Sequence, residues 1–401
     1  MNNLPVKGPI ADDGLEVLEG FGILVQDGRI KDIAPFEVLK QVAGVEDVEI
    51  KYLNGNYVVV PGMIDAHTHI CYAGSRATDY AMRLSGKSYL EIAEKGGGIW
   101  STVTDTRAAT EDDLYCLTRE RALRMLFDGV TTAEVKSGYT LSVEGELKML
   151  RVIRSLNDSL DIDLVSTCLA AHMVPKDFTG SSVEYLKYIL EDLLPEIKSQ
   201  QLSNRIDVFI DKSAFTPEEG LKYLQQGSEM GFDLVVHADQ FTTRGSEIAC
   251  LVKAVSADHL EASTDMEIQM LAKSDVVPVC LPGASMGLGM PFAPARKLLD
   301  AGTSLAIASD WNPGSAPMGD LLMQASVLGA YERLTMAETI AAITVRAASA
   351  LQLNDRGILK TGLLADFSIF ATSDYRDIFY HQGRMKPEMV VKRGRAIGSR
   401  Q

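Results

Sequence analysis

Short β-rich runs alternate with amphipathic helical stretches through the middle of the chain, and this alternation restricts the fold more than any other feature. The runs number eight: Tyr57–Ile64, Val130–Val135, Asp163–Ala170, Ile206–Ile210, Leu234–Val236, Val255–Ala257, Val276–Cys280 and Ser304–Ala308. Strands separated by helices favour a parallel sheet, and eight strand-then-helix units predict an α/β fold, a (β/α)8 TIM barrel. A doubly wound sheet is the competing architecture, but it requires a glycine-rich phosphate turn after its first strand, which residues 61–69 lack.

Three of the helical stretches are well defined by their sequence. Glu111–Phe127 follows Thr110, a residue suited to the N-cap, and has acidic residues in its first turn. Pro217–Met230 follows Thr216 and places a proline at the first helical position. Met336–Leu351 is predicted as a third, continuous helix.

Both ends of the chain predict β structure. The segments are Gly22–Val25, Arg29–Ile33, Val48–Val60, Ala365–Phe370 and Met389–Ile397. The dipeptide Asp27-Gly28 predicts a hairpin turn between the first two, and Arg393-Gly394 divides the last. We therefore expect one small β-sandwich domain built from residues 1–60 and 353–401, flanking a barrel domain of residues 61–352.

Charge and cysteine usage limit the partners and the compartment. The formal net charge of -15 argues against nucleic acid and against an anionic membrane surface. The five cysteines are widely spaced without a Cys-x-x-Cys pair, which disfavours disulfides and a cysteine zinc site and favours a reducing cytoplasm. The N-terminus has neither the basic start nor the apolar segment of a signal peptide, and no run is long and apolar enough to cross a bilayer.

Five of the six histidines follow predicted barrel strands. They are His67 and His69 after the first strand, His172 after the third, His237 after the fifth and His259 after the sixth. Asp310 follows the eighth strand. Because catalytic groups of such barrels gather at the carboxyl ends of the strands, we expect these side chains to meet at one rim.

Four of these side chains form a candidate metal site. His67 and His69 lie two residues apart on an extended segment, so that both imidazoles point to the same side. With His237 and the carboxylate of Asp310 they supply three nitrogens and one oxygen. Zinc or iron suits this set, whereas Mg²⁺ and Ca²⁺ prefer shells made of oxygen alone. Such an ion lowers the pKa of water to about 7, which provides a nucleophile at neutral pH.

The residues around this site form recognisable segments. Those nearest the metal are Asp65-Ala66-His67-Thr68-His69, His237, His259 and Ser309-Asp310. They resemble the metal centre of the amidohydrolase superfamily, whose members join a (β/α)8 barrel to a small sheet domain built from both termini. Seven further segments are Tyr72–Arg76, Lys95–Ile99, Glu134–Tyr139, His237–Gln240, Ser256–Leu260, Leu281–Gly283 and Asp310–Gly314. Jointly they are similar to the imidazolonepropionase family.

The resemblance implies a reaction and a role for each site residue. That family hydrolyses the ring amide of 4-imidazolone-5-propanoate to N-formimino-L-glutamate in histidine degradation. It implies one bound metal on His67, His69, His237 and Asp310, proton transfer by His259 and Asp310, and a homodimer. The implied substrate contacts are His172 and Gln240 with the imidazolone ring, Arg76, Tyr89 and Tyr139 with the propionate, and Asn312 and Gly314 in the ring pocket. A guanidinium suits a carboxylate because it donates two parallel hydrogen bonds.

The sequence leaves alternatives open. A deaminase of the same superfamily would need a glutamate three residues after the strand-five histidine, where Gln240 cannot act as an acid or base near neutral pH. Departures from the family pattern at Ala170-Ala171, Gly245-Ser246 and Arg346 leave room for a sister amidohydrolase acting on another cyclic amide. A non-catalytic scaffold would lose metal ligands, which this chain keeps. Some relatives carboxylate a lysine to bridge two metals, but we expect Lys136 to be unmodified here.

Overall fold

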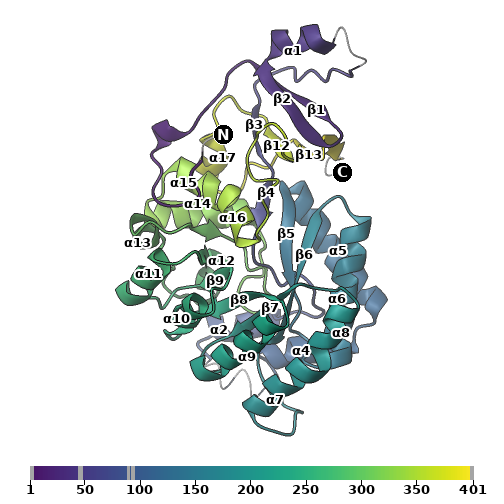
Figure 1. Cartoon of the computed structure of the whole chain (residues 1–401), viewed down its shortest axis with the longest axis vertical. Coiled ribbons are helices and arrows are strands. Elements are labelled where there is room, and N and C mark those ends of the chain that lie inside the picture. The colour runs from purple at the N-terminus through teal and green to yellow at the C-terminus, as the bar shows by residue number, and fades with distance from the viewer. Residues whose placement is uncertain (1–3, 44–47, 88–90, 92–94, 398–401) are drawn as a thin grey trace.

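Eight parallel strands form a nearly closed barrel in the computed structural model, which describes residues 4–43, 48–87, 91 and 95–397 (Figure 1). In chain order, and neighbour to neighbour, they are β4 (Met63–Asp65), β5 (Val130–Lys136), β6 (Asp163–Ala171), β7 (Arg205–Phe209), β8 (Asp233–Ala238), β9 (Ser256–His259), β10 (Val277–Cys280) and β11 (Ala306–Ile307). A parallel bridge between Thr68 and Asp310 joins the segment that follows the first strand to the segment that follows the last. The predicted (β/α)8 fold is confirmed, and the closing bridge lies at the predicted metal site.

Most helices surround the barrel and follow its strands, whereas the first helix packs against the N-terminal hairpin (Figure 1). The described helices are α1 (Phe36–Ala43), α2 (Ala77–Leu84), α4 (Ile99–Ala108), α5 (Glu111–Phe127), α6 (Val143–Ser159), α7 (Ser182–Tyr188), α8 (Leu194–Ser199), α9 (Pro217–Glu229), α10 (Gly245–Leu251), α11 (Asp265–Ala272), α12 (Pro282–Leu288), α13 (Ala295–Asp300), α14 (Leu321–Glu332), α15 (Met336–Ala342), α16 (Val345–Ala350) and α17 (Asp377–Tyr380), with the short turns η1 (Asp12–Gly14) and η2 (Ile189–Leu193). Among the described residues, no helix combines the length and the apolar character needed to span a bilayer.

Two helices start where their capping residues predict. Thr110 accepts the amide of Asp113, whose carboxylate accepts the Thr110 amide in return, so α5 begins with a complete capping box. Thr216 and Glu219 form the same arrangement at the start of α9. Both predictions rest on residues close together in the chain, and both are confirmed.

The single helix predicted at Met336–Leu351 is wrong, because the chain breaks it into α15 and α16. Thr344, between them, has φ −132° and ψ −98°, outside the helical region. The break leaves the Ile343 carbonyl free to accept the amide of Ile64 at 2.8 Å, on the first barrel strand. A continuous helix would use that carbonyl for its own hydrogen bonds.

The strand predicted at Tyr57–Ile64 is also divided, at Gly62. Its first part, β3 (Val58–Pro61), pairs antiparallel with β12, whereas β4 enters the barrel. A Cβ at Gly62 would lie 2.4 Å from Thr131 Oγ1, so the close approach that separates the two sheets requires glycine. The sequence predicts β structure over Val48–Val60. Residues 48–57 have irregular backbone, so that part of the prediction is wrong.

Segments from both termini build two small sheets at one end of the molecule (Figure 1). They are the hairpin of β1 (Phe21–Gln26) and β2 (Arg29–Pro35), and the four-stranded sheet of β14 (Arg395–Ile397), β13 (Met389–Lys392), β12 (Phe367–Phe370) and β3. Asp27 and Gly28 have φ values of 51° and 75°, which suit the predicted hairpin turn. Ile30, Phe367 and Val391 share the core between the sheets. These sheets are compatible with a sandwich domain, whose bounds at residues 1–60 and 353–401 stay a prediction.

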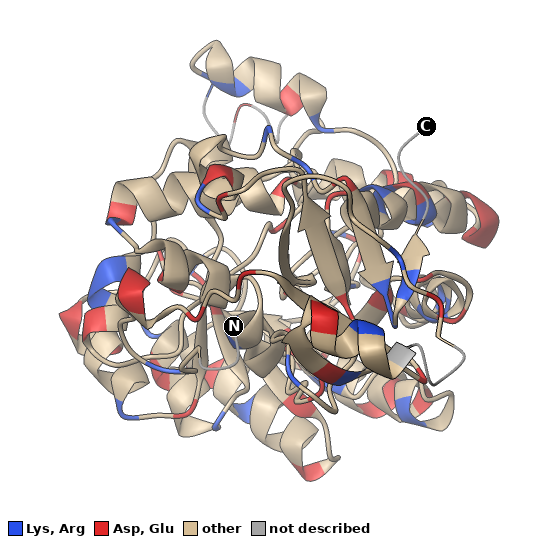
Figure 2. Ribbon diagram, turned by 90° about the horizontal axis from the view of Figure 1, so that it is seen from above, with Lys and Arg blue, Asp and Glu red and all other residues tan. Residues whose placement is uncertain are grey.

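Acidic and basic residues are mixed along the outer helices, as the view from above shows (Figure 2). The excess of 54 acidic over 39 basic residues is therefore spread over the molecule. The charges that matter for chemistry lie inside the barrel, not on this surface.

Candidate metal-dependent active site

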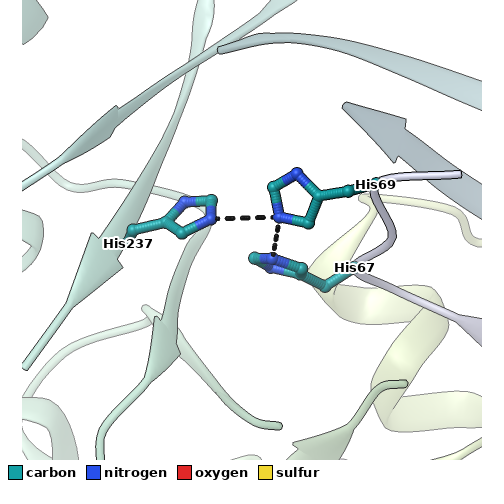
Figure 3. Close-up of side chains that lie close together, drawn as sticks. All are labelled: His67, His69 and His237. Carbon is teal, nitrogen blue, oxygen red and sulfur yellow. Dashed lines mark hydrogen bonds between the residues drawn. The ribbon is translucent and has the colours of Figure 1, made fainter. Parts of the chain in front are cut away.

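Three imidazoles converge where the barrel strands end (Figure 3). Nε2 of His69 lies 3.1 Å from Nε2 of His67 and 3.4 Å from Nε2 of His237. Two nitrogen ligands of a tetrahedral zinc ion, each about 2.0–2.1 Å from the metal, lie about 3.4 Å from each other. The three nitrogens are therefore spaced as ligands of one such ion would be.

Asp310 adds a carboxylate to this group. Its Oδ1 lies 3.4 Å from Nε2 of His69 and 3.7 Å from Nε2 of His67. The same oxygen is buried without a hydrogen-bond partner, whereas Oδ2 accepts the Ser315 hydroxyl at 2.7 Å. A buried carboxylate oxygen is costly unless a cation or donor faces it. This unpaired oxygen, beside three imidazole nitrogens, fits a zinc or iron ion.

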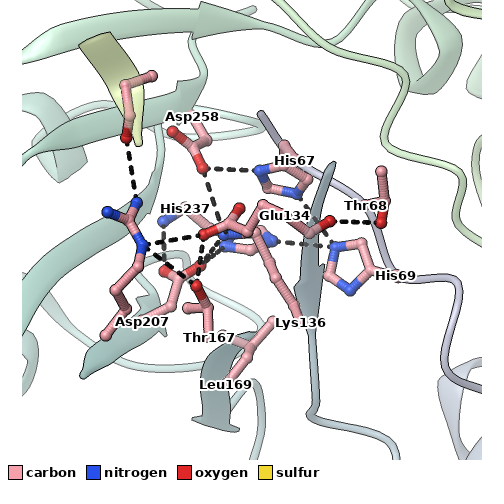
Figure 4. A network of polar contacts seen from close by, with 12 residues as sticks. His67, Thr68, His69, Glu134, Lys136, Thr167, Leu169, Asp207, His237 and Asp258 are labelled. Carbon is pink, nitrogen blue, oxygen red and sulfur yellow. Dashed lines mark hydrogen bonds and ion pairs between the residues drawn. The ribbon is translucent and has the colours of Figure 1, made fainter. Parts of the chain in front are cut away.

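Two buried carboxylates orient the histidines from behind (Figure 4). Asp258 Oδ2 lies 2.6 Å from His67 Nδ1, and Asp207 Oδ2 lies 2.8 Å from His237 Nδ1. Contacts of this kind set the tautomer of a metal-binding histidine and turn its other nitrogen toward the ion. The sequence interpretation missed both residues. Their signal was an aspartate inside, or directly after, a predicted strand.

Burial keeps these imidazoles in the form that binds metals. It lowers the pKa of His67 and His69 well below the ordinary value, and it lowers that of His237 to about 3. Burial also raises the pKa of Asp310 to about 6. A metal ligand must be a neutral imidazole or a carboxylate anion, so a cation bound here would complete the ionisation of Asp310.

His259 lies beside the metal-binding group. Its ring centroid is 5.2 Å from that of His237 and 5.7 Å from that of His67. Burial alone would lower the pKa of His259, but Glu261 and Asp310 raise it above the ordinary value. Glu261 Oε2 lies 3.6 Å from His259 Nδ1. The sequence interpretation missed Glu261, although an acid two residues after a candidate catalytic histidine was a signal for it.

His172 and Tyr139 form a wall of the site next to His69. The His172 ring stacks on His69, with centroids 5.7 Å apart and planes inclined by 22°, and its Nδ1 donates to the Gly138 carbonyl at 3.1 Å. Nε2 of His172 is therefore the acceptor. The fully buried Tyr139 ring lies 5.8 Å from His69 and 5.6 Å from His172. Both predicted residues lie at the metal centre.

Arg76 lies close to Gly314 at the rim. A Cβ on Gly314 would come within 2.8 Å of Arg76 Nη1, so the two predicted residues are neighbours. Arg76 Nε donates to Asp79 at 2.5 Å, and the same oxygen of Asp79 accepts the Gly98 amide at 2.8 Å. Asp79, which the sequence interpretation missed, thus ties Arg76 to the loop that contains Gly96, Gly97 and Gly98.

Three predicted contact residues remain: Asn312, Gln240 and Tyr89. Asn312 Oδ1 accepts the amides of Gly314 at 2.8 Å and Ser315 at 3.3 Å, so its side chain holds its own turn. Gln240 is buried directly after Asp239, which has a φ of 52°. Tyr89 lies outside the described residues.

Lys136 lies in the barrel interior with carboxylates on several sides. Burial alone would lower its pKa, but Asp207, Glu134 and Asp258 raise the pKa above the ordinary value. An ammonium has no free lone pair for carboxylation. These surroundings therefore favour the unmodified lysine that we expected.

Known proteins match both the sequence and the fold. A model of the amidohydrolase family matches residues 189–397. An imidazolonepropionase from Myxococcus xanthus is 40% identical, covering 96% of this chain and 92% of the relative. Another from Geobacillus kaustophilus is 37% identical over 98% and 93%.

Two solved structures share the fold at low sequence identity. A 5-methylcytosine deaminase from Klebsiella pneumoniae liganded with phosphonocytosine has a TM-score of 0.71 at 16% identity and covers 95% of each chain. An atrazine chlorohydrolase from Arthrobacter aurescens complexed with zinc has a TM-score of 0.66 at 15% identity, over 98% of this chain and 94% of that one. Fold, site geometry and identity along nearly the whole sequence agree, and the chain belongs to the imidazolonepropionase family of amidohydrolases.

Proposed function

We propose that the chain hydrolyses the ring amide of 4-imidazolone-5-propanoate to N-formimino-L-glutamate in histidine degradation. The observation that supports this most directly is the convergence of three imidazole nitrogens and one unpaired carboxylate oxygen, in a chain similar to imidazolonepropionases. His67, His69, His237 and Asp310 would hold one zinc or iron ion, since both metals accept this donor set. When bound, the ion supplies a Lewis acid for the ring carbonyl and makes water a nucleophile near neutral pH.

Two residues of the site transfer the protons. Water adds to the carbonyl carbon, the ring C–N bond breaks, and the departing nitrogen takes up a proton. One side-chain atom each of His67, His259 and Asp310 lies within 4.8 Å of the other two. His259 and Asp310 are therefore placed to accept the proton of water and return it to that nitrogen. The carboxylate of Glu261, 3.6 Å from His259 Nδ1, favours the protonated form of His259 that returns this proton.

The predicted contacts divide between the two ends of the substrate, the imidazolone ring and the propionate. His172 and Gln240 hold the ring, and Asn312 and Gly314 shape its pocket. Arg76 binds the propionate, together with Tyr139 and Tyr89. The contact with Asp79 uses Nε of Arg76, which leaves its Nη groups for a carboxylate.

The same proposal extends to the setting of the enzyme. The resemblance to the family supports a homodimer. The widely spaced cysteines, all free thiols in the structure, support a cytoplasmic location.

The test is turnover of freshly generated 4-imidazolone-5-propanoate by purified protein, with the metal content measured on the same sample. We expect the imidazolone absorbance to fall while N-formimino-L-glutamate forms, and we expect about one metal ion per chain. A fully metallated sample without turnover would contradict the substrate and direct the search to other cyclic amides bearing a carboxylate. Release of ammonia from cytosine would instead indicate a deaminase.

A further inference from the structure

Lys136 lies beneath the metal-binding histidines, fully buried inside the barrel (Figure 4). Its Nζ is 2.8 Å from Glu134 Oε2, 2.8 Å from Asp207 Oδ2 and 3.5 Å from Asp258 Oδ2. Lys136, Asp207 and Asp258 belong to β5, β7 and β9. Alternate strands of a (β/α)8 barrel supply one interior layer, which is usually filled by branched apolar side chains. Here one ammonium links three strands of such a layer through ion pairs.

The oxygens that face Lys136 also face the metal-binding histidines. Asp258 Oδ2 contacts both Lys136 Nζ and His67 Nδ1, and Asp207 Oδ2 contacts both Lys136 Nζ and His237 Nδ1. A continuous chain of polar contacts therefore runs from His67 through Asp258, Lys136 and Asp207 to His237. Within this series of contacts, Lys136 alone touches both Asp207 and Asp258.

We propose that Lys136 is a positioning residue of the metal centre, which holds Asp258 and Asp207 so that they aim Nε2 of His67 and His237 at the ion. The two carboxylates depend on Lys136 to different extents. Asp207 has a second support, since its Oδ1 accepts the His237 amide at 3.1 Å. Asp258 Oδ1 is buried without a hydrogen-bond partner, so Oδ2 makes the contacts with His67 and Lys136, and the Ser256 side chain adds one further contact to this carboxylate.

Loss of the lysine has two effects on metal affinity, and they differ in sign. Removal of a positive charge near a cation strengthens binding through Coulomb's law alone. Loss of orientation weakens binding, and changes to groups that support metal ligands reduce affinity by about 10–100-fold. A positioning role predicts that the second effect prevails.

The experiment compares two buried lysines. Lys136→Met removes the residue in question, and Lys392→Met is the matched control. Lys392 is 2% exposed and lies between Asp163 (2.7 Å) and Asp366 (2.5 Å), at the far end of β6 from the metal centre. The zinc affinity of metal-free protein is measured by competition with a chromophoric chelator, and the thermal midpoint is measured for both variants.

We expect Lys136→Met to bind zinc about 10–100-fold more weakly than the wild type. Lys392→Met should keep the wild-type affinity although its thermal midpoint falls. Wild-type or tighter affinity in Lys136→Met would overturn the proposal, and so would an equal loss of affinity in both variants.

Paired variants keep the test open if a single one does not fold. Lys136→Met with Glu134→Gln, and Lys392→Met with Asp366→Asn, each remove one cation and one anion, and the same difference in zinc affinity is expected. The inference rests on the proposed metal ligands. Wild-type protein that binds no zinc, or His237→Ala with wild-type affinity, would overturn that ligand assignment itself, whereas a zinc-binding wild type with unaltered Lys136→Met overturns only the role of Lys136.

Discussion

Charged side chains gather at both ends of the barrel, and the two clusters differ in burial and in how completely their polar atoms are paired. The metal-end cluster comprises Glu134, Lys136, Arg205, Asp207, Asp258 and Asp310, and the sheet-end cluster comprises Asp163, Asp355, Arg356, Asp366, Lys392 and Arg393. At the metal end, Glu134 Oε2, Asp258 Oδ1, Asp310 Oδ1 and Arg205 Nη1 are buried without a hydrogen bond. Among the described residues, no side chain of the sheet-end cluster has such an atom.

The sheet-end cluster joins the barrel to the terminal sheets. Asp163, the first residue of β6, contacts Lys392 at 2.7 Å, Arg356 at 2.5 Å and Arg393 at 3.0 Å. Lys392 belongs to β13, so these ion pairs connect segments that are far apart in the sequence. Buried polar atoms are nearly always paired in folded proteins. We infer from this difference that the paired cluster stabilises the fold, whereas the unpaired Asp310 Oδ1 beside the histidines is available to a bound cation.

The largest expected effect is that of His237→Ala at the metal end. Loss of one imidazole should reduce the bound metal to well under one ion per chain and reduce turnover by more than about 10³-fold, because metal charge carries most of the rate enhancement. Metal analysis and turnover of the same sample measure it.

The control for that variant is Lys392→Met at the sheet end. It should lose about 3–5 kcal/mol of unfolding free energy, since it leaves the buried carboxylate of Asp366 without its ion-pair partner, but keep its metal and its turnover. A Lys392→Met protein that is stable but has lost its metal would break the comparison between the two ends.

His259→Ala should separate chemistry from metal binding within the metal end. We expect turnover to fall by about 10²–10⁴-fold through loss of acid–base catalysis, while the metal content stays near that of the wild type. Near-normal turnover in this variant would assign the proton transfer to Asp310 alone.

Arg76→Ala should mainly weaken substrate binding. We expect KM to rise by about 10–100-fold with a smaller change in kcat, if the carboxylate contact is equal in the ground and transition states. Arg376→Ala removes an exposed ion pair with Asp374 and serves as the control. An unchanged KM in Arg76→Ala would place the propionate elsewhere.

The smallest expected effect is that of acidification, which should reduce the stabilisation that Asp163 provides at the sheet end. Burial alone would raise the pKa of Asp163, but Lys392, Arg356 and Arg393 lower it below the ordinary value. The stabilisation by this carboxylate is therefore full above the unfolded-state pKa of about 3.9 and is lost as the pH falls through the folded pKa. The difference in unfolding free energy between the wild type and Asp163→Asn should shrink below about pH 4. A difference that stays constant down to pH 3 or so would contradict this linkage.

Some of the site could be predicted because its signals are local. Histidines directly after strands reach the carboxyl rim in any (β/α)8 barrel, so His67, His69, His172, His237 and His259 meet as expected. Asp207 and Asp258 were missed because their roles depend on partners brought near by folding. Asp258, for example, lies 191 residues from His67 in the sequence. Glu261 and Asp79 were missed although their partners His259 and Arg76 lie only two and three residues away.

The sequence by itself determined the barrel, the start of α5 and α9, and the turns at Asp27-Gly28 and Arg393-Gly394. In each case neighbouring residues carry the physical cause, whether periodicity, a capping hydroxyl or a left-handed backbone. Only the tertiary structure decided the break at Thr344, the division of one β-rich run at Gly62, and the linkage of Lys136 to both metal-supporting carboxylates. These features arise from hydrogen bonds, close approaches and ion pairs between distant segments, and no local pattern records which distant segment will supply the partner.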